Sequence, residues 1–228
     1  MDGQQIQVIA RMRSDFSEKF GIPRQSGLVE QLQSYIVFEP EFRNSDALRG
    51  IEGYTHLWLI WQFSQAMGKP WSPTVRPPRL GGNTRMGVFA TRSPFRPNSL
   101  GLSCVRLLEV RHTPDRGDIL VVGGADLLDG TPIFDIKPYL PYCDSHPEAL
   151  GGFTDNAGDF LLDVVFPEAL LERLPEEKRQ AAIGVLSHDP RPSYQRSPGR
   201  VYGLSFAGFD IRFTVEENTL TVHDVEKQ

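Results

Sequence analysis

Short apolar segments, separated by turns rich in glycine and proline, occupy about the first 140 residues of the chain. Residues 56–63, His-Leu-Trp-Leu-Ile-Trp-Gln-Phe, are typical of a buried strand. Little helical periodicity falls between these segments, so the pattern predicts a mainly β fold in which seven or eight strands form an antiparallel or mixed β-barrel. The other predicted strands are residues 6–10, 35–38, 86–90, 102–108, 118–122, 125–128 and 131–136.

The dipeptide Asp129-Gly130 stands between the last two of these predicted strands. Both residue types tolerate a positive φ, and Asp-Gly between apolar runs is a strong hairpin signal. The sequence therefore predicts a tight hairpin that joins residues 125–128 to residues 131–136.

The pattern changes after residue 142. Residues 143–159 are rich in Gly, Ser, Asp and Pro and are typical of a linker. Residues 167–174 and 175–186 each begin with proline followed by acids, which predicts two helices. Three further strand-like runs end the chain at residues 200–206, 209–215 and 219–222. We expect a β-barrel domain at residues 1–142, a linker at 143–159 and a small α+β domain at 160–228.

Composition narrows the class of protein. The 228 residues carry a formal net charge of -5 and only two cysteines, too few for the disulfide framework of a secreted protein. No apolar stretch approaches the roughly 20 residues that cross a bilayer, and the first residues lack a signal-peptide pattern. We therefore expect a cytoplasmic protein without a membrane partner.

Motifs of several common enzyme classes are missing from the sequence. The five histidines are scattered and neither cysteine has a C-x-x-C partner, so we expect no metal site. The sequence has no G-x-S-x-G elbow, no P-loop, and no G-x-G-x-x-G after a predicted strand. These absences disfavour ordinary hydrolases, kinases and dehydrogenases.

Arginines gather in one interval that contains no Asp or Glu. Such an interval is either a solvated surface whose balancing acids lie elsewhere in space or a face that binds phosphate or carboxylate. Its arginines are Arg76, Arg79, Arg85, Arg92, Arg96 and Arg106.

Residues 87–101, Gly-Val-Phe-Ala-Thr-Arg-Ser-Pro-Phe-Arg-Pro-Asn-Ser-Leu-Gly, form the densest motif. Two prolines stiffen this predicted loop, which presents Arg92 and Arg96. A stiff loop loses little entropy when it binds, and arginine grips anions with two hydrogen bonds. A proline-stiffened surface turn with locally paired arginines would give the same pattern.

This segment closely resembles the signature of the TrmO (TsaA-like, YaeB) family of tRNA adenine-N6 methyltransferases. Residues 23–25, 76–82, 129–141 and 189–194 match further stretches of the family pattern in order. The resemblance covers most of the chain and implies a single-sheet β-barrel methyltransferase that uses S-adenosylmethionine and works as a homodimer. The implied substrate is N6-threonylcarbamoyl-adenosine beside the anticodon of threonine tRNA, methylated on N6.

The resemblance also implies a set of cofactor-binding residues. Arg92 would hold the methionine carboxylate of the cofactor or orient the tRNA, and Leu102 would pack on the adenine. Ser64 stands where many family members have His, which leaves a hydroxyl or backbone contact at that position. The full set is Pro23, Arg24, Gln25, Ser64, Gln65, Arg92, Leu102, Asp129, Gly130, Thr131 and Pro132.

Methyl transfer to N6 is helped by removal of the N6 proton. Asp135, Lys137 and Tyr139 alternate along a predicted strand and would face one side of it. Asp135 is the candidate proton acceptor and Tyr139 a stacking or hydrogen-bonding partner for the base, although a plain solvent-facing strand would look the same. The candidate tRNA-binding residues are Arg76, Arg79, Arg96, Asp189, Arg191 and Tyr194.

Two other functions remain open at this point. One is a regulatory protein that senses S-adenosylmethionine without methyl transfer. The other is a methyltransferase of the same fold that acts on a different RNA or small molecule.

Overall fold

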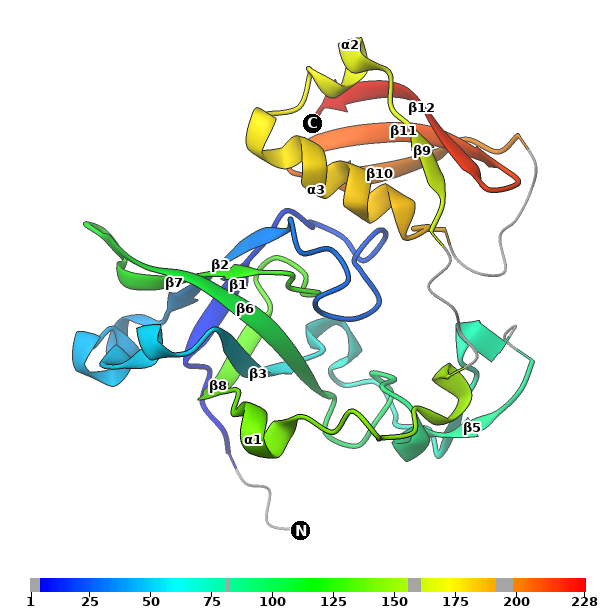
Figure 1. Ribbon diagram of the computed structural model, residues 1–228. Coiled ribbons are helices and arrows are strands. Elements are labelled where there is room, and N and C mark those ends of the chain that lie inside the picture. The colour runs from blue at the N-terminus through cyan, green and yellow to red at the C-terminus, as the bar shows by residue number, and fades with distance from the viewer. Residues whose placement is uncertain (1–4, 81–82, 156–160, 192–198) are drawn as a thin grey trace.

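The computed structural model describes residues 5–80, 83–155, 161–191 and 199–228. Six strands pair antiparallel in the closed order β1-β2-β7-β6-β3-β8, in which β8 pairs back with β1 (Figure 1). The prediction of a mainly β chain is confirmed. The strands are β1 (Ala10–Arg13), β2 (Gln33–Phe38), β3 (His56–Gln62), β6 (Leu100–Thr113), β7 (Gly117–Gly123) and β8 (Pro132–Pro138).

Alternation of side chains along β3 builds the core of this sheet. Leu57 and Leu59 are fully buried and Trp61 nearly so, whereas the residues between them are only partly covered. Successive side chains of a strand point to opposite faces, so one face of β3 faces inward. In β1, Ala10 and Met12 point inward in the same way, while Arg11 and Arg13 pair with Glu39 and Asp129.

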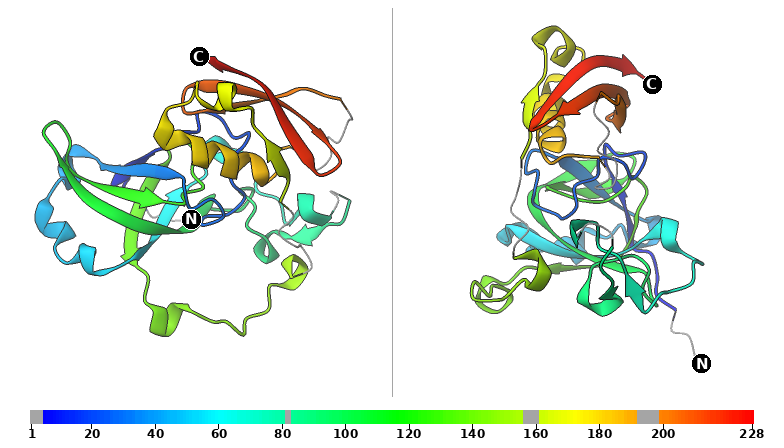
Figure 2. Two further views of the ribbon diagram at one scale, coloured as in Figure 1. Left: turned by 45° about the horizontal axis from the view of Figure 1, so that its top comes forward. Right: turned by 90° about the vertical axis from the view of Figure 1, so that its right-hand side faces the viewer.

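The C-terminal part forms a separate four-stranded sheet in the order β10-β11-β12-β9. Its first strand, β9, lies parallel to β12, so the sheet adds one strand to the predicted three-stranded meander. Figure 1 and both views of Figure 2 place this sheet at one end of the molecule. The elements of this C-terminal part are β9 (Asp163–Val165), α2 (Glu168–Leu171), α3 (Glu176–Ser187), β10 (Tyr202–Phe206), β11 (Phe209–Glu216) and β12 (Thr219–Lys227).

The segment between β1 and β2 belongs to the core of the C-terminal sheet. Phe16, Val29 and Leu32 are buried in one cluster with residues of α3, β10, β11 and β12. The rings of Phe16 and Phe206 lie 5.5 Å apart, and Lys178 donates a 2.6 Å hydrogen bond to Asp15. The two sheets are therefore joined by a shared apolar core as well as by the chain between them.

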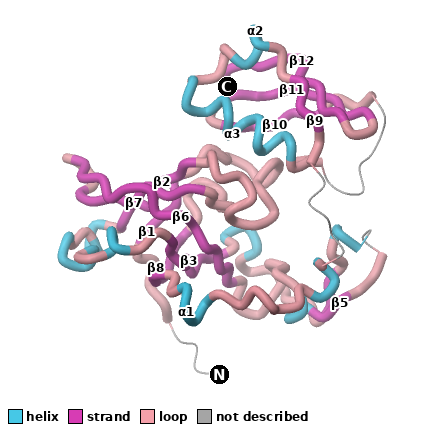
Figure 3. The backbone as a smooth tube through the Cα atoms, in the orientation of Figure 1, coloured by secondary structure: helices cyan, strands magenta, loops and turns pink. Residues whose placement is uncertain are grey.

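Loops and short helices make up most of the chain between β3 and β6 (Figure 3). This part contains a two-stranded sheet of β4 (Thr74–Val75) and β5 (Met86–Gly87). The remaining short helices are α1 (Pro141–Asp144), η1 (Pro40–Phe42), η2 (Ser45–Leu48), η3 (Ile51–Gly53), η4 (Ser64–Ala66), η5 (Pro78–Leu80), η6 (Val88–Ala90) and η7 (Gly152–Thr154).

Three of the strand predictions need correction. The first strand covers Ala10–Arg13 rather than residues 6–10, and residues 88–90 form a 3-10 turn rather than the continuation of a strand. Residues 125–128 form no strand, and the predicted hairpin at Asp129-Gly130 is wrong because β7 pairs with β2 and β6 whereas β8 pairs with β1 and β3.

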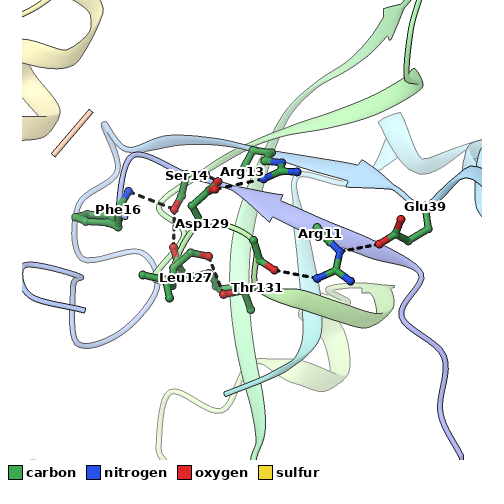
Figure 4. A network of polar contacts seen from close by, with 10 residues as sticks. Arg11, Arg13, Ser14, Phe16, Glu39, Leu127, Asp129 and Thr131 are labelled. Carbon is green, nitrogen blue, oxygen red and sulfur yellow. Dashed lines mark hydrogen bonds and ion pairs between the residues drawn. The ribbon is translucent and has the colours of Figure 1, made fainter. Parts of the chain in front are cut away.

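Figure 4 shows what the Asp129 carboxylate does instead. It accepts hydrogen bonds from the Ser14 N–H at 3.1 Å and from Arg13 at 3.3 Å, and the Ser14 hydroxyl donates to the Leu127 carbonyl at 2.8 Å. Gly130 has the positive φ expected of a turn, 75°. The turn thus fastens the end of β1 to the segment before β8.

Candidate functional site

A pocket of about 490 Å³ lies where the loop after Lys19, the end of β3 and the start of β6 meet. Its wall combines apolar side chains with a small number of charged ones, and its volume falls in the range of about 300–1,000 Å³ that is typical of small-molecule sites. The lining residues used below are Pro23, Arg24, Gln25, Ser64, Gln65, Arg92, Arg96, Leu102, Asp126 and Thr131.

Strand ends bring these residues together from distant parts of the sequence. Ser64 and Gln65 lie just after the end of β3, and Leu102 is the third residue of the neighbouring strand β6. Asp126 and Thr131 lie in the connection from β7 to β8. Since β3 pairs with both β6 and β8, the ends of these strands meet at one side of the sheet.

Asp126 is the acidic residue of this pocket wall. Its Oδ1 accepts a 2.6 Å hydrogen bond from the Ser103 hydroxyl, whose oxygen in turn accepts a 3.0 Å bond from the Trp61 indole N–H. Burial raises the pKa of Asp126, because the ionised carboxylate loses hydration, and the Ser103 hydrogen bond and the Arg92 charge only partly oppose this shift. A partly buried carboxylate thus lines a pocket that also contains a guanidinium.

Arg92 is exposed and lies between this pocket and a larger neighbour. Its Nη1 donates a hydrogen bond to the Gln25 side-chain oxygen, which ties the loop after β5 to the loop after β1. Arg96 has a different role, because its Nη1 donates to the Thr91 carbonyl at 3.0 Å and to the Ser93 carbonyl at 3.1 Å. Arg96 therefore braces the proline-rich loop that carries Arg92.

The neighbouring pocket has a volume of about 1260 Å³. Both pockets are lined by Arg24, Gln25, Thr91, Arg92 and Pro94, so they share one wall. A smaller pocket and a larger groove therefore adjoin along the loop of residues 91–96.

Most of the predicted cofactor residues line the smaller pocket. These are Pro23, Arg24, Gln25, Ser64, Gln65, Arg92, Leu102 and Thr131. Asp129, Gly130 and Pro132 are not among its lining residues. The Asp129 carboxylate binds Arg13 and Ser14 instead (Figure 4). Asp126 was not identified as a site residue from the sequence. The feature that could have revealed it is a single acid inside the apolar run of residues 119–128.

The predicted catalytic residues do not line either of these pockets. Asp135 and Lys137 share one face of β8, as expected, but they form an ion pair with each other at 3.0 Å. The Tyr139 ring packs against Trp58 with ring centroids 5.8 Å apart. The structure therefore does not bring this trio to the site where the cofactor is expected.

The predicted tRNA residues are divided between different places. Arg76 lines the larger pocket, whereas the side chain of Arg79 and residue Tyr194 lie outside the described residues. Asp189 and Arg191 bind each other through hydrogen bonds of 2.7 and 2.9 Å, and the Arg191 side chain is 9% exposed. This pair closes the turn that follows α3, and its proposed contact with tRNA stays a prediction.

Within the described residues, no helix has both the length and the apolar character needed to cross a membrane. The same residues contain no group of three or more His, Cys, Asp or Glu side chains that would hold a metal ion.

Comparisons with known proteins agree along the whole chain. The tRNA-methyltransferase O N-terminal domain family matches residues 11–145, and the TrmO C-terminal domain family matches residues 160–228. A tRNA (adenine(37)-N6)-methyltransferase of Escherichia coli is 42% identical over 99% of both chains. A crystal structure of TrmO from P. aeruginosa superposes with a TM-score of 0.81 at 34% identity, and the match covers 100% of this chain and 99% of that one.

A further relative from Pseudomonas aeruginosa is 39% identical over 91% of both chains, and its name describes an S-adenosylmethionine-dependent methyltransferase. Fold, pocket and domain matches together define a tRNA methyltransferase with a mainly β structure. The chain belongs to the tRNA-methyltransferase O (TrmO) family.

Proposed function

We propose that this protein transfers a methyl group from S-adenosylmethionine to N6 of adenosine 37 in tRNA, and that its substrate is the N6-threonylcarbamoyl form beside the anticodon of threonine tRNA. Full-length similarity to a tRNA (adenine(37)-N6)-methyltransferase supports the reaction and the position. The threonylcarbamoyl group and the threonine isoacceptors rest on the family resemblance alone. The observation that carries the proposal is the pocket of about 490 Å³ that joins a wide basic groove along Arg92.

The residues of the smaller pocket fit the cofactor chemically. S-adenosylmethionine supplies the methyl group and presents a carboxylate, an ammonium group, ribose hydroxyls and an adenine. Arg92 offers a guanidinium for the carboxylate, Asp126 offers a carboxylate for a cofactor donor, and Leu102 offers an apolar surface for the adenine. A pocket with only one sign of charge would leave part of such a ligand unpaired.

Asp126 is the residue that we assign to the donors of the cofactor. Its hydrogen-bond partners are the Ser103 hydroxyl at Oδ1 and the backbone N–H groups of Ser26 and of Asp126 itself, none of which carries a positive charge. Partial burial makes the ionised carboxylate costly, so a cationic donor of the cofactor bound there would stabilise the complex. Arg92 has the complementary task at the wall that the pocket shares with the groove.

Positioning supplies most of the rate acceleration in this proposal. Methyl transfer from a sulfonium centre needs a nucleophile held in line, which a stiff loop of residues 91–96 favours. The proton on N6 must also leave, and because Asp135 lines neither pocket and pairs with Lys137, its role as the acceptor stays a prediction. We propose that the closed six-stranded sheet is the catalytic β-barrel, that residues 143–159 link it to the C-terminal domain at 160–228, and that the protein works as a cytoplasmic homodimer.

Methyl transfer to purified tRNA tests the proposal. The purified protein is incubated with S-adenosylmethionine carrying a labelled methyl group and with threonine tRNA that either carries or lacks threonylcarbamoyl. Nucleoside mass spectrometry should locate the label on the threonylcarbamoylated adenosine. Cofactor binding without transfer to any tRNA would contradict the proposal and favour a sensor, and transfer to another nucleoside would change the substrate.

A further inference from the structure

The larger pocket is strongly basic although the whole chain is acidic. Arg24, Arg76, Arg85 and Arg92 line it, and none of its described lining residues is acidic. The formal net charge of the chain is -5, so this local excess of positive charge does not follow from composition. Such a groove is complementary to a phosphate backbone.

The charges in this groove are not neutralised by ion pairs with described acids. Arg85 donates a 3.1 Å hydrogen bond to the Thr74 hydroxyl, and Arg92 donates to Gln25, so both bind neutral partners. A bidentate anion can displace or extend such contacts without breaking a salt bridge, although Arg92 also lies within electrostatic reach of Asp126.

Two phenylalanines of the groove wall are exposed. Phe89 is 76% exposed and Phe95 is 43% exposed, and both line the larger pocket and not the smaller one. Exposed aromatic rings beside arginines are typical of sites where unpaired bases stack.

The backbone behind Phe89 is held firmly. Its neighbour Val88 is buried, and the Val88 N–H donates to the Pro73 carbonyl at 3.0 Å. The Phe95 carbonyl likewise accepts a 3.1 Å bond from the Ser72 N–H. When a base stacks on a ring whose backbone is already held, little further conformational entropy is lost. Binding at these rings is therefore weakened less by ordering than it would be on a mobile loop.

We propose that the groove binds the unpaired nucleotides that flank the methylated base, with bases stacked on Phe89 and Phe95 and phosphates on Arg24 and Arg76. This inference rests on the proposed function, because the shared wall at Arg92 leads from the groove into the pocket expected to hold the methyl donor. To the arginines of the N-terminal part that the sequence already suggested for tRNA, it adds Arg24 and the two exposed rings, Phe89 and Phe95.

Phe89→Ala tests the stacking contact, and Tyr142→Ala is its matched control. Tyr142 is another exposed aromatic residue, 86% accessible, and it lines neither pocket. Affinity is measured by the fluorescence of an anticodon stem-loop RNA with 2-aminopurine beside the target base, and cofactor affinity by calorimetry. Phe89→Ala should weaken RNA binding about five- to hundredfold, the range for one lost stacking contact, with unchanged cofactor affinity. Phe89→Trp should retain binding.

Arg76→Ala provides a second, independent measurement. It should lower RNA affinity and reduce the slope of log affinity against log salt by about one, as expected when one phosphate contact is lost. Equal RNA affinity in Phe89→Ala, Arg76→Ala and Tyr142→Ala would overturn the inference. A change of oligomeric state in Phe89→Ala without loss of RNA affinity would also overturn it, because the ring would then contact a second copy of the chain.

The two proposals fail in different ways. If the wild-type protein methylates tRNA but Phe89→Ala binds RNA normally, only the groove is wrong. If the groove variants lose RNA affinity although the wild-type protein transfers no methyl group, RNA binding in the groove is supported and the proposed methyl transfer is contradicted.

Discussion

Gly101 lies so close to Trp61 that a β-carbon at position 101 would be 2.3 Å from the indole Cε2. The two residues are direct partners across β3 and β6. The indole therefore lies flat over the glycine, and from this position its N–H reaches Ser103, which binds Asp126. Because position 101 has no side chain, the indole can take the place from which it orients Ser103 and, through Ser103, Asp126 in the smaller pocket.

Gly101→Ala should destabilise the protein by about 1–3 kcal/mol, because the indole or the strand must move to accept the methyl group. Urea unfolding measures this change. Gly53→Ala is the control, since a β-carbon at Gly53 would meet nothing within 4 Å. If both variants unfold at the same urea concentration, the indole is not confined by Gly101. A further expectation is lower cofactor affinity in Gly101→Ala alone.

Asp126→Asn should weaken binding of S-adenosylmethionine about tenfold or more, because a hydrogen bond to a charged group contributes roughly 1.5–3 kcal/mol. Asn retains an oxygen that accepts from Ser103, so the fold should persist. Calorimetry across pH gives the second readout. Wild-type affinity should fall as pH decreases through the raised pKa of Asp126, and the variant should lose that dependence. A wild-type affinity that is constant with pH would remove Asp126 from the cofactor site.

The same residue predicts how stability depends on pH. The pKa of Asp126 is raised in the folded state, so the folded protein binds this proton more tightly than the unfolded chain does. The free energy of unfolding contributed by Asp126 therefore decreases as pH rises from the unfolded value through the folded one. Without ligand, Asp126→Asn should melt at a higher temperature than wild type at about pH 8, and the difference should vanish below about pH 4. A variant that is less stable at both pH values would contradict the buried-charge explanation.

Arg92→Ala should lower methyl transfer by at least about tenfold, or ~1.4 kcal/mol, because it removes the guanidinium shared by pocket and groove. Arg92→Lys should recover only part of the activity if the contact is bidentate. Single-turnover transfer to tRNA measures both. Arg116→Ala is the matched control, since Arg116 is exposed and pairs with Asp115 outside both pockets. Wild-type rates in Arg92→Ala would exclude the residue from the site.

The loop that begins the smaller pocket depends on the C-terminal sheet. Gly21 has a φ of 87°, and a β-carbon there would lie 2.1 Å from Leu204 Cδ1. Gly21→Ala should therefore shift the loop of Pro23 and Gln25 and lower cofactor affinity. Gly27→Ala is a close control, because Gly27 has a φ of 81° but nothing within 4 Å of its added carbon. Both variants share the cost of a left-handed alanine, so a larger loss in Gly21→Ala isolates the contact with Leu204. Equal cofactor affinity in the two variants would show that the sheets act independently.

Local patterns predicted most of the strands and helices. The apolar run of β3 and the Pro-acid starts of α2 and α3 lie where the sequence indicated. The first strand was misplaced because Arg11 and Arg13 obscure the alternation of Ala10 and Met12, and the arginines are accommodated only by the distant acids Glu39 and Asp129. No window of sequence contains both members of such pairs.

For the site, too, local sequence features were predicted and contacts between distant residues were not. Family resemblance found the pocket residues, but it offered no signal for Asp126, whose environment is made by Ser103 and Trp61 from other strands. Alternation correctly placed Asp135 and Lys137 on one face of β8. It gave no information on which face of the closed sheet meets a pocket, because that depends on how β8 pairs with both β1 and β3.

The burial of Phe16, Val29 and Leu32 among residues of α3 and β10 to β12 has a consequence for folding during synthesis on the ribosome. All six strands of the closed sheet have been made once Pro138 is joined, yet the segment between β1 and β2 still lacks the surface against which it packs. That surface is completed only when β12 (Thr219–Lys227) emerges from the ribosome. Because Pro23 and Gln25 belong to this segment, we expect a nascent chain to acquire its affinity for the methyl donor only after β12 has been made, later than the sheet beside the pocket.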